Sequence, residues 1–116
     1  MRVKQSVLVL DHEPDSLAAL SGMFHCAGFK TISCASVSQI LRRQPLVRAD
    51  CIIANAGIPL LPDTQLIPFL QSAQPDVPVI LITNNQDIAA AVDAIRAGAK
   101  HLLQKPVVDR ILLEHV

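Results

Sequence analysis

The sequence predicts a single α/β domain in which a parallel five-stranded sheet lies between two layers of helices. Five short apolar segments alternate with segments whose apolar residues recur at helical spacing. The apolar segments are nearly continuous, which is typical of parallel strands that are buried on both faces. Strands that alternate with helices also imply right-handed crossovers, so helices are expected on both faces of the sheet. The 116 residues suffice for one domain with its own core, and residues 1–116 are treated as one unit.

Local signals place the first two strands and helices. The first helix follows an apolar strand, carries apolar side chains on one face and ends at Gly28, since glycine is favoured just beyond a helix. Ser36 and Gln39 fit a capping box for a short second helix that reaches about Arg43. The five expected strands are residues 6–10, 31–34, 51–54, 77–83 and 101–104.

The third helix is expected within residues 64–73, with a complication at Pro68. Proline lacks the N–H that a helix interior needs and is tolerated in the first turn. We therefore expect the helix to start late, near Gln65 or Leu66, after a long loop.

The remaining helices follow from similar signals. Asn84 and Asn85 are expected to cap a fourth helix that runs from residue 86 or 87 to 97 and is terminated by Gly98. The last helix starts near Val108. Apolar side chains spaced for one face of the fourth helix are Ile88, Val92 and Ile95.

Charge and composition exclude several classes of function. The 10 Lys+Arg residues balance the 10 Asp+Glu residues, and Arg42–Arg43 is the only adjacent basic pair, so we expect no direct nucleic-acid binding by this domain. No apolar run approaches the roughly 18 residues of a membrane span, and the N-terminus lacks a signal-peptide cleavage site. We expect a cytoplasmic protein whose three cysteines are small buried side chains rather than disulfides or metal ligands.

Polar residues collect where the expected strands end. Ligands of open α/β sheets bind beyond the carboxyl ends of the strands, so these residues are the candidate site. They are Asp11, His12, Glu13, Asn55, Thr83 and Lys105.

Motifs at these positions resemble those of response-regulator receiver domains. An apolar strand leads into the acidic Asp11, residues 54–59 match the segment around the phosphorylated aspartate, Thr83 ends the fourth strand, and residues 98–106 match the Gly-Ala to Lys-Pro segment. The resemblance covers essentially the whole chain. It implies a flavodoxin-like (βα)5 three-layer sandwich with strand order 2-1-3-4-5.

The chain departs from the receiver pattern at three positions. Asn55 stands where receivers carry the aspartate that attacks phosphorus, and a neutral amide lacks that nucleophilic oxygen. His12 stands where a second acidic residue binds magnesium, which prefers oxygen ligands. Leu102 replaces the aromatic ring that follows the Ser or Thr hydroxyl during switching. The resemblance therefore implies weak or absent magnesium binding, no cofactor, and lost phosphorylation.

Several roles stay open for the retained residues. Asp11 is either a remnant ligand or, as we favour, a carboxylate that caps the first helix or pairs with Lys105. His12 is either a metal ligand or, more often at such positions, a solvated loop residue. Thr83 is expected to bond locally or to Asn55. Lys105 is expected to point into the vestigial pocket.

We therefore hypothesise a phosphorylation-independent receiver-like module of a two-component regulator. It acts through protein contacts on an attached transcriptional output domain, and residues 1–116 are expected to be the N-terminal part of a longer regulator. A homodimer through the fourth helix, fifth strand and fifth helix is a candidate assembly, since the fourth helix carries small residues: Ala89, Ala90, Ala91 and Ala94.

Other hypotheses remain. The vestigial pocket is a candidate sensor site for a small molecule or anion. Phosphorylation of Asp50 is the weakest hypothesis, because this residue precedes the third strand at the wrong end of the sheet. No enzyme is expected, because the sequence has neither a Gly-rich phosphate loop nor a Ser/Cys–His arrangement with a recognisable spacing.

Overall fold

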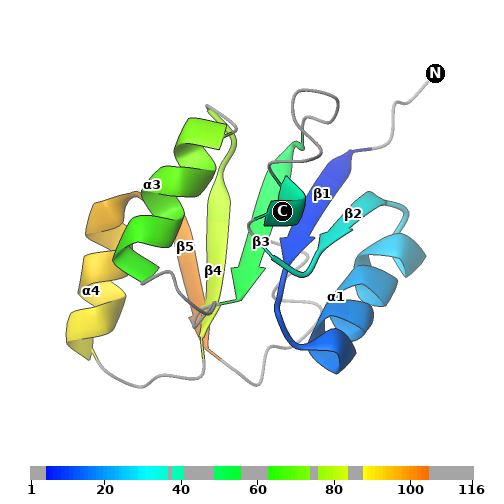
Figure 1. Ribbon diagram of the computed structural model, residues 1–116, viewed down its shortest axis with the longest axis horizontal. Coiled ribbons are helices and arrows are strands. Elements are labelled where there is room, and N and C mark those ends of the chain that lie inside the picture. Colours follow the sequence, from blue (N-terminus) through cyan, green and yellow to red (C-terminus); the bar gives the residue numbers. More distant parts are fainter. Residues whose placement is uncertain are drawn as a thin grey trace.

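A computed structural model describes residues 5–36, 38–40, 49–55, 63–73, 76–83 and 88–104. Its five strands form one parallel sheet in the order β2-β1-β3-β4-β5 (Figure 1). This confirms the fold class and the strand order expected from the sequence. The strands are β1 (Ser6–Leu10), β2 (Lys30–Cys34), β3 (Cys51–Asn55), β4 (Val79–Thr83) and β5 (His101–Gln104).

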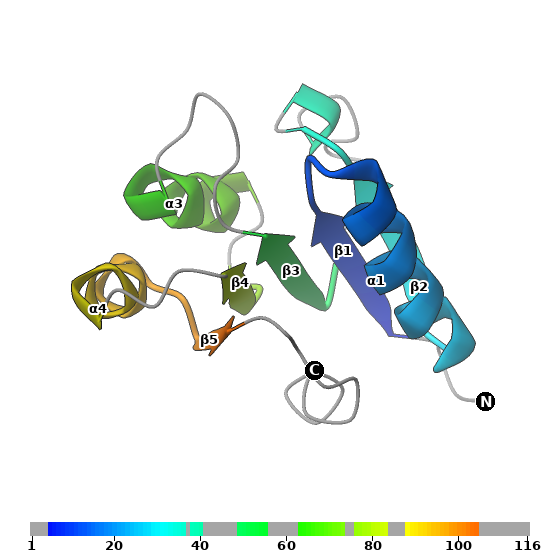
Figure 2. The same cartoon turned by 90° about the horizontal axis from the view of Figure 1, so that it is seen from below.

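The helices cover opposite faces of this sheet. Helix α1 (Pro14–Cys26) packs on one face, whereas α3 (Asp63–Ala73) and α4 (Ile88–Ala97) pack on the other (Figure 2). Successive residues of β1 point alternately toward these two layers, so Val7 joins the core under α1 and Leu8 the core under α3. Strands β3 and β4 are buried along their whole length, which explains the apolar run that each of them carries before its polar last residue.

The predicted helix ends at Gly28 and Gly98 are confirmed. Helix α1 ends two residues before Gly28 and α4 one residue before Gly98, and their backbone φ angles are +94° and +119°. Residues with a Cβ rarely adopt such angles, which explains why glycine stands at both positions. Gln71 on α3 adds a link, because its Nε2 donates to the Gly98 carbonyl at 3.1 Å.

The capping signal before the second helix is also confirmed. The Ser36 hydroxyl accepts a hydrogen bond from the Gln39 backbone N–H at 3.3 Å. The Gln39 side chain reaches back to the N–H of Ala35 at 2.6 Å, one residue earlier than a standard capping box. Residues 38–40 are helical. The expected end near Arg43 lies outside the described residues.

The expected late start of the third helix is wrong. Helix α3 begins at Asp63 and continues through Pro68. Three neighbours of Pro68, namely Leu66, Ile67 and Leu70, are completely buried, while Pro68 itself is exposed. These buried side chains hold the helix on the sheet, and their burial outweighs the one backbone hydrogen bond that Pro68 cannot donate.

Three side chains differ from what their apolar context indicated. Helix α4 leaves Val92 and Ile95 exposed, at 42% and 48% of their surface, so their shared face points away from the described core. Cys26 is also exposed, because Phe24 takes the inward position in the last turn of α1, whereas Cys34 and Cys51 are buried as expected.

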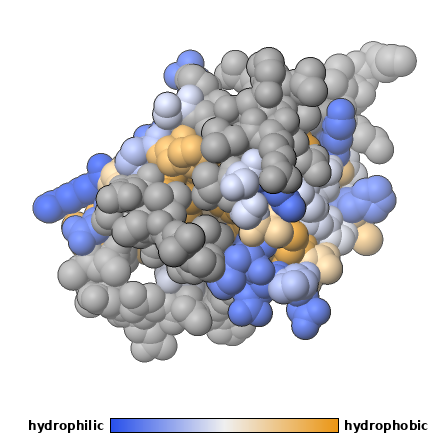
Figure 3. All heavy atoms as spheres, viewed as in Figure 1, coloured by the Kyte–Doolittle hydropathy of each residue, from blue (hydrophilic) through white to orange (hydrophobic). Residues whose placement is uncertain are grey.

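Hydrophilic side chains separate smaller apolar patches on the side shown in Figure 3. Among the described helices none combines the length and the apolar character that crossing a membrane requires.

Candidate functional site

The carboxyl ends of three adjacent strands form the candidate site. Asp11 follows the last residue of β1, Asn55 is the last residue of β3 and Thr83 the last of β4. In the register, Leu10 pairs with Ala54 and Asn55 pairs with Ile82. Neighbouring strands lie roughly 4.8 Å apart, so the sheet brings these three residues together at the edge seen at the bottom of Figure 1.

These three residues are also the buried polar side chains of the described part of the chain. Their exposed fractions are 0% for Asp11, 5% for Asn55 and 8% for Thr83. Polar groups are seldom buried without partners, because desolvation is costly. Their concentration at one edge of the sheet therefore distinguishes this edge from the rest of the described core, which is apolar.

Asp11 is held firmly but only partly satisfied. Its backbone N–H donates to the Cys34 carbonyl at 3.1 Å, which continues the ladder between β1 and β2. Its Oδ1 accepts a hydrogen bond from the Glu13 backbone N–H at 2.9 Å, at the entry to α1. Its Oδ2 is buried and accepts no hydrogen bond within the described chain. Asp11 therefore bonds through Oδ1 to Glu13, the residue before α1, and does not form the expected cap on the first turn of that helix, while Oδ2 remains available for another group.

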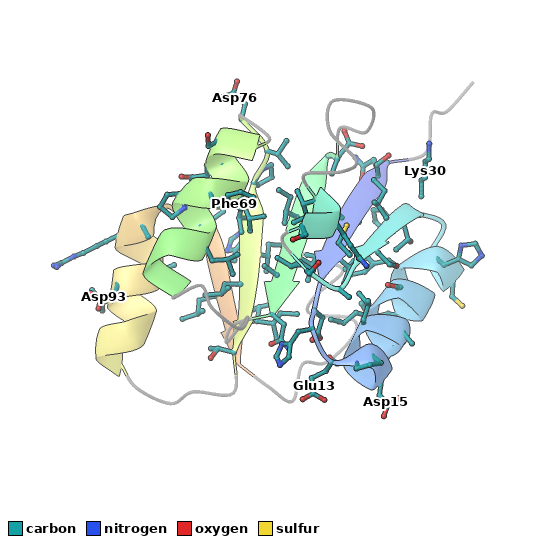
Figure 4. All side chains as sticks on the ribbon, viewed as in Figure 1. Glu13, Asp15, Lys30, Phe69, Asp76 and Asp93 are labelled. Atoms are coloured by element: carbon teal, nitrogen blue, oxygen red, sulfur yellow. The ribbon has the colours of Figure 1, made fainter. Side chains whose placement is uncertain are left out.

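The other candidate residues lie in different surroundings. His12 is exposed although it follows the buried Asp11, and Glu13 is exposed and points outward at the start of α1 (Figure 4). Thr83 takes part in a further interaction. Leu102 is half-buried and packs against the core under α3. Lys105 lies outside the described residues.

Magnesium, the metal that receivers with an acidic residue at the position of His12 bind, does not fit the donor set that the structure describes here. Magnesium takes an octahedral set of oxygens and usually keeps several waters. Asp11 supplies one unbonded carboxylate oxygen, and that atom is buried. Asn55 is neutral and His12 offers nitrogen. Within the described ranges, no group of three or more His, Cys, Asp or Glu side chains is arranged to hold a metal ion.

Asp50 occupies the opposite edge of the sheet. Its Oδ2 accepts a hydrogen bond from the Ser6 backbone N–H at 2.7 Å, and its own N–H donates to the Ser6 carbonyl at 2.8 Å. Asp50, which directly precedes β3, is therefore tied to the start of β1. This position is far from Asn55 along the strand and favours a structural role over phosphorylation.

The sequence profile of the response regulator receiver domain matches residues 7–116. The transcriptional regulatory protein PrrA of Mycobacterium leprae is 29% identical over 88% of this chain and 44% of its own length. The C4-dicarboxylate transport transcriptional regulatory protein DctD of Rhizobium meliloti is 31% identical over 97% of this chain and 25% of its own length. The chain thus spans less than half the length of these relatives.

Solved structures support the same fold. Full-length FixJ from B. japonicum superimposes with a TM-score of 0.86 at 24% identity, covering 99% of this chain and 57% of that one. A CheY-like receiver domain protein from Methanospirillum hungatei superimposes with a TM-score of 0.87 at 20% identity, covering 97% and 90% of the two chains. At these identities the likeness establishes the fold alone.

Proposed function

Because the chain belongs to the response regulator receiver domain family, whose profile covers residues 7–116, we propose that it is a receiver that signals without aspartyl phosphorylation. The observation that carries the proposal is Asn55. This side chain closes β3 at the buried carboxyl edge, beside Asp11 and Thr83, where the motif of residues 54–59 aligns it with the phosphoacceptor.

The chemistry of the Asn55 amide explains why phosphorylation would be lost. Phosphoryl transfer to a receiver needs an anionic carboxylate oxygen that attacks phosphorus and forms an acyl phosphate. The Asn55 amide is neutral and forms no such ester. Two further departures act on the same pathway, since His12 disfavours a hard metal ion and Leu102 lacks a ring that could follow Thr83. The domain is thus proposed to have no catalytic activity of its own.

Mass spectrometry of the intact chain tests this proposal. After incubation with acetyl phosphate and magnesium, the mass of the wild-type chain should be unchanged. An Asp50→Asn variant, treated in parallel, controls for modification at the amino edge of the sheet. A gain of one phosphoryl group in both chains would contradict the proposal. A gain that is lost in Asp50→Asn would contradict it too, because it would identify Asp50 as the acceptor.

The output is proposed to be transcriptional and to lie elsewhere in a longer cytoplasmic protein. The relatives are named as transcriptional regulatory proteins, and the matched region covers 44% and 25% of their lengths. The net charge of zero favours nucleic-acid contact by such an output domain rather than by residues 1–116.

A homodimer through α4, β5 and the fifth helix expected from the sequence is part of the proposal. Val92 and Ile95 are the large hydrophobic side chains that the described part of the chain leaves exposed, and both lie on α4, so their surface is the candidate contact. Sedimentation of the wild type should therefore shift toward dimer with concentration, and Val92→Glu should remove that shift. A wild type that stays monomeric at high concentration would contradict a dimer.

A ligand-sensing role is a second candidate function. The observation in its favour is the Asp11 Oδ2, a buried carboxylate oxygen without a hydrogen-bond partner in the described chain. Such an atom favours a ligand that donates hydrogen bonds and disfavours the anion expected from the sequence.

A further inference from the structure

We infer that the Gln71 side chain is a latch that holds the last turn of α4 against α3 and so sets the position of the α4 surface, the exposed apolar patch of Val92 and Ile95. The inference rests on the proposed function in one respect, because it takes this surface as the contact face of the domain. It adds the residue that positions the surface.

The latch is a hydrogen bond between two helices that lie side by side on one face of the sheet (Figure 2). Gln71 lies in the last turn of α3, and its Nε2 donates to the carbonyl of Gly98, the residue directly after α4, at 3.1 Å. The Gly98 N–H in turn donates to the Ile95 carbonyl at 3.0 Å. Gly98 therefore joins α3 to the turn of α4 that carries Ile95.

The backbone at Gly98 leaves space for the Gln71 amide. A Cβ at this position would lie 2.8 Å from Oε1 and 2.9 Å from Cδ of Gln71, and closer still to Nε2, so a residue with a side chain would displace the amide. Gly28, which follows α1, provides the comparison. It also has a positive φ, but a Cβ there would meet nothing within 4 Å. The end of a helix thus accounts for Gly28, whereas Gly98 also accommodates a side chain of α3.

The two helices differ in how firmly their own side chains are buried. Helix α3 is anchored by three completely buried side chains, Leu66, Ile67 and Leu70. Of the α4 side chains that the structure describes, only Ala97 packs against the core, and the others are exposed. A single methyl group buries little apolar area. The position of α4 therefore depends more on the Gln71 contact than the position of α3 does.

Opening of the latch acts directly on the α4 surface. An exposed hydrogen bond between neutral groups is weak, so it opens readily and releases the Gly98 carbonyl to water. Ile95 belongs to the turn that is then freed, and Val92 lies about one turn earlier on the same helix. Both side chains move with that turn. The latch thus regulates the contact face without any change at the carboxyl edge of the sheet.

Nuclear magnetic resonance of the 116-residue chain, at a concentration at which it is monomeric, tests the latch. Gln71→Ala should move the methyl resonances of Val92 and Ile95. It should also raise the hydrogen-exchange rates of the α4 amides about fivefold, as expected for one lost hydrogen bond. The α1 amides should keep their rates, because local opening of α4 leaves α1 in place. Ser72→Ala, which alters the neighbouring exposed residue of α3, should change none of these values.

A double-mutant cycle tests whether the two partners of the latch act as a pair. Gly98→Ala places a methyl group where the Gln71 amide lies. It should therefore raise the α4 exchange rates by a larger factor in the wild type than in Gln71→Ala, where that space is free. Gly28→Ala is the matched control, since its effect on the α1 amides should be the same in both backgrounds.

Two results would overturn the inference. One is a Gln71→Ala chain in which the α4 exchange rates, or the Val92 and Ile95 methyl resonances, match those of the wild type. The other is an effect of Gly98→Ala that is equally large in both backgrounds. The proposed dimer fails separately, in sedimentation of the wild type, so each idea can fail without the other.

Discussion

The two edges of the sheet hold aspartates in contrasting surroundings, although both flank the pair of strands β1 and β3. At the amino edge, the exposed Asp50 exchanges two hydrogen bonds with the backbone of Ser6, at 2.7 and 2.8 Å. At the carboxyl edge, Asp11 is completely buried and keeps one oxygen without a partner in the described chain. Figure 4 shows the labelled Lys30 and Asp76 near the first edge and Glu13 near the second.

This difference separates a structural carboxylate from one that belongs to a site. The Asp50 carboxylate is exposed to water and already has a hydrogen-bond donor in the Ser6 backbone. Replacing Asp50 should therefore change the stability of the fold and little else. Asp11 has lost its water and gained only one hydrogen bond, an arrangement that a protein retains at some cost. The following predictions test this contrast, from the largest expected effect to the smallest.

Restoring phosphorylation at the carboxyl edge should give the largest change. Asn55→Asp rebuilds the nucleophile but leaves His12 at the usual metal-ligand position and Leu102 at the switch, so it should label poorly from acetyl phosphate with magnesium. The double variant His12→Asp with Asn55→Asp rebuilds a hard oxygen site. It should incorporate about tenfold more phosphate, the scale on which metal-site changes act. Labelling is measured with and without magnesium.

A matched control lies at the other edge. Adding Asp50→Asn to the double variant should leave its labelling intact, because Asp50 is separated from the site by the length of β3. Efficient magnesium-dependent labelling of Asn55→Asp alone would contradict the account of a doubly altered pocket, since it would mean that His12 does not impair it.

The second prediction concerns Cys51, which is the first residue of β3 and follows Asp50. Burial raises the pKa of its thiol from 9.0 to about 11, with smaller opposing effects from its hydrogen bond to the Ile52 carbonyl and from Lys100. The folded state therefore keeps this proton between pH 9 and 11 while the unfolded state loses it. Stability should fall as the pH rises through that window, by up to about 2 kcal/mol from this group.

Comparison with Cys51→Ala isolates this effect from other alkaline titrations. The free energy of urea unfolding of both proteins is followed from pH 8 to 11, and the wild type should lose more stability than the variant. Parallel pH profiles would show that the buried thiol titrates normally, which contradicts the raised pKa.

Much of this fold was predictable because its signals are local. Gly28 and Gly98 mark backbone angles that other residues rarely adopt, and the apolar run of β4 reflects burial on both faces. The start of α3 was not predictable from Pro68, because burial of Leu66 and Ile67 outweighs one lost hydrogen bond. Tertiary packing, which helix propensities do not include, therefore determines where α3 begins.

The candidate site was also predictable from the sequence only in part. Sequence order placed Asp11, Asn55 and Thr83 at strand ends, and the parallel register brings them to one edge. The sequence grouped His12 with them, yet the chain turns outward after Asp11 and leaves His12 exposed. The unpartnered oxygen of Asp11 had no sequence signal, since it depends on which backbone N–H reaches the other oxygen.

The last prediction removes the carboxylate at the amino edge. Asp50→Ala deletes the hydrogen bond that Asp50 Oδ2 accepts from the Ser6 N–H at 2.7 Å, whereas Asp50→Asn keeps an acceptor oxygen there. Because the pair is exposed, the loss for Asp50→Ala should be only about 0.5–1 kcal/mol in urea unfolding, and Asp50→Asn should lose less. The Glu13 amide resonance should not move in either variant, because the contacts of Asp50 end at the start of β1. A shift of that resonance would mean that the two edges of the sheet are coupled, and the separation of a structural from a site carboxylate would no longer hold.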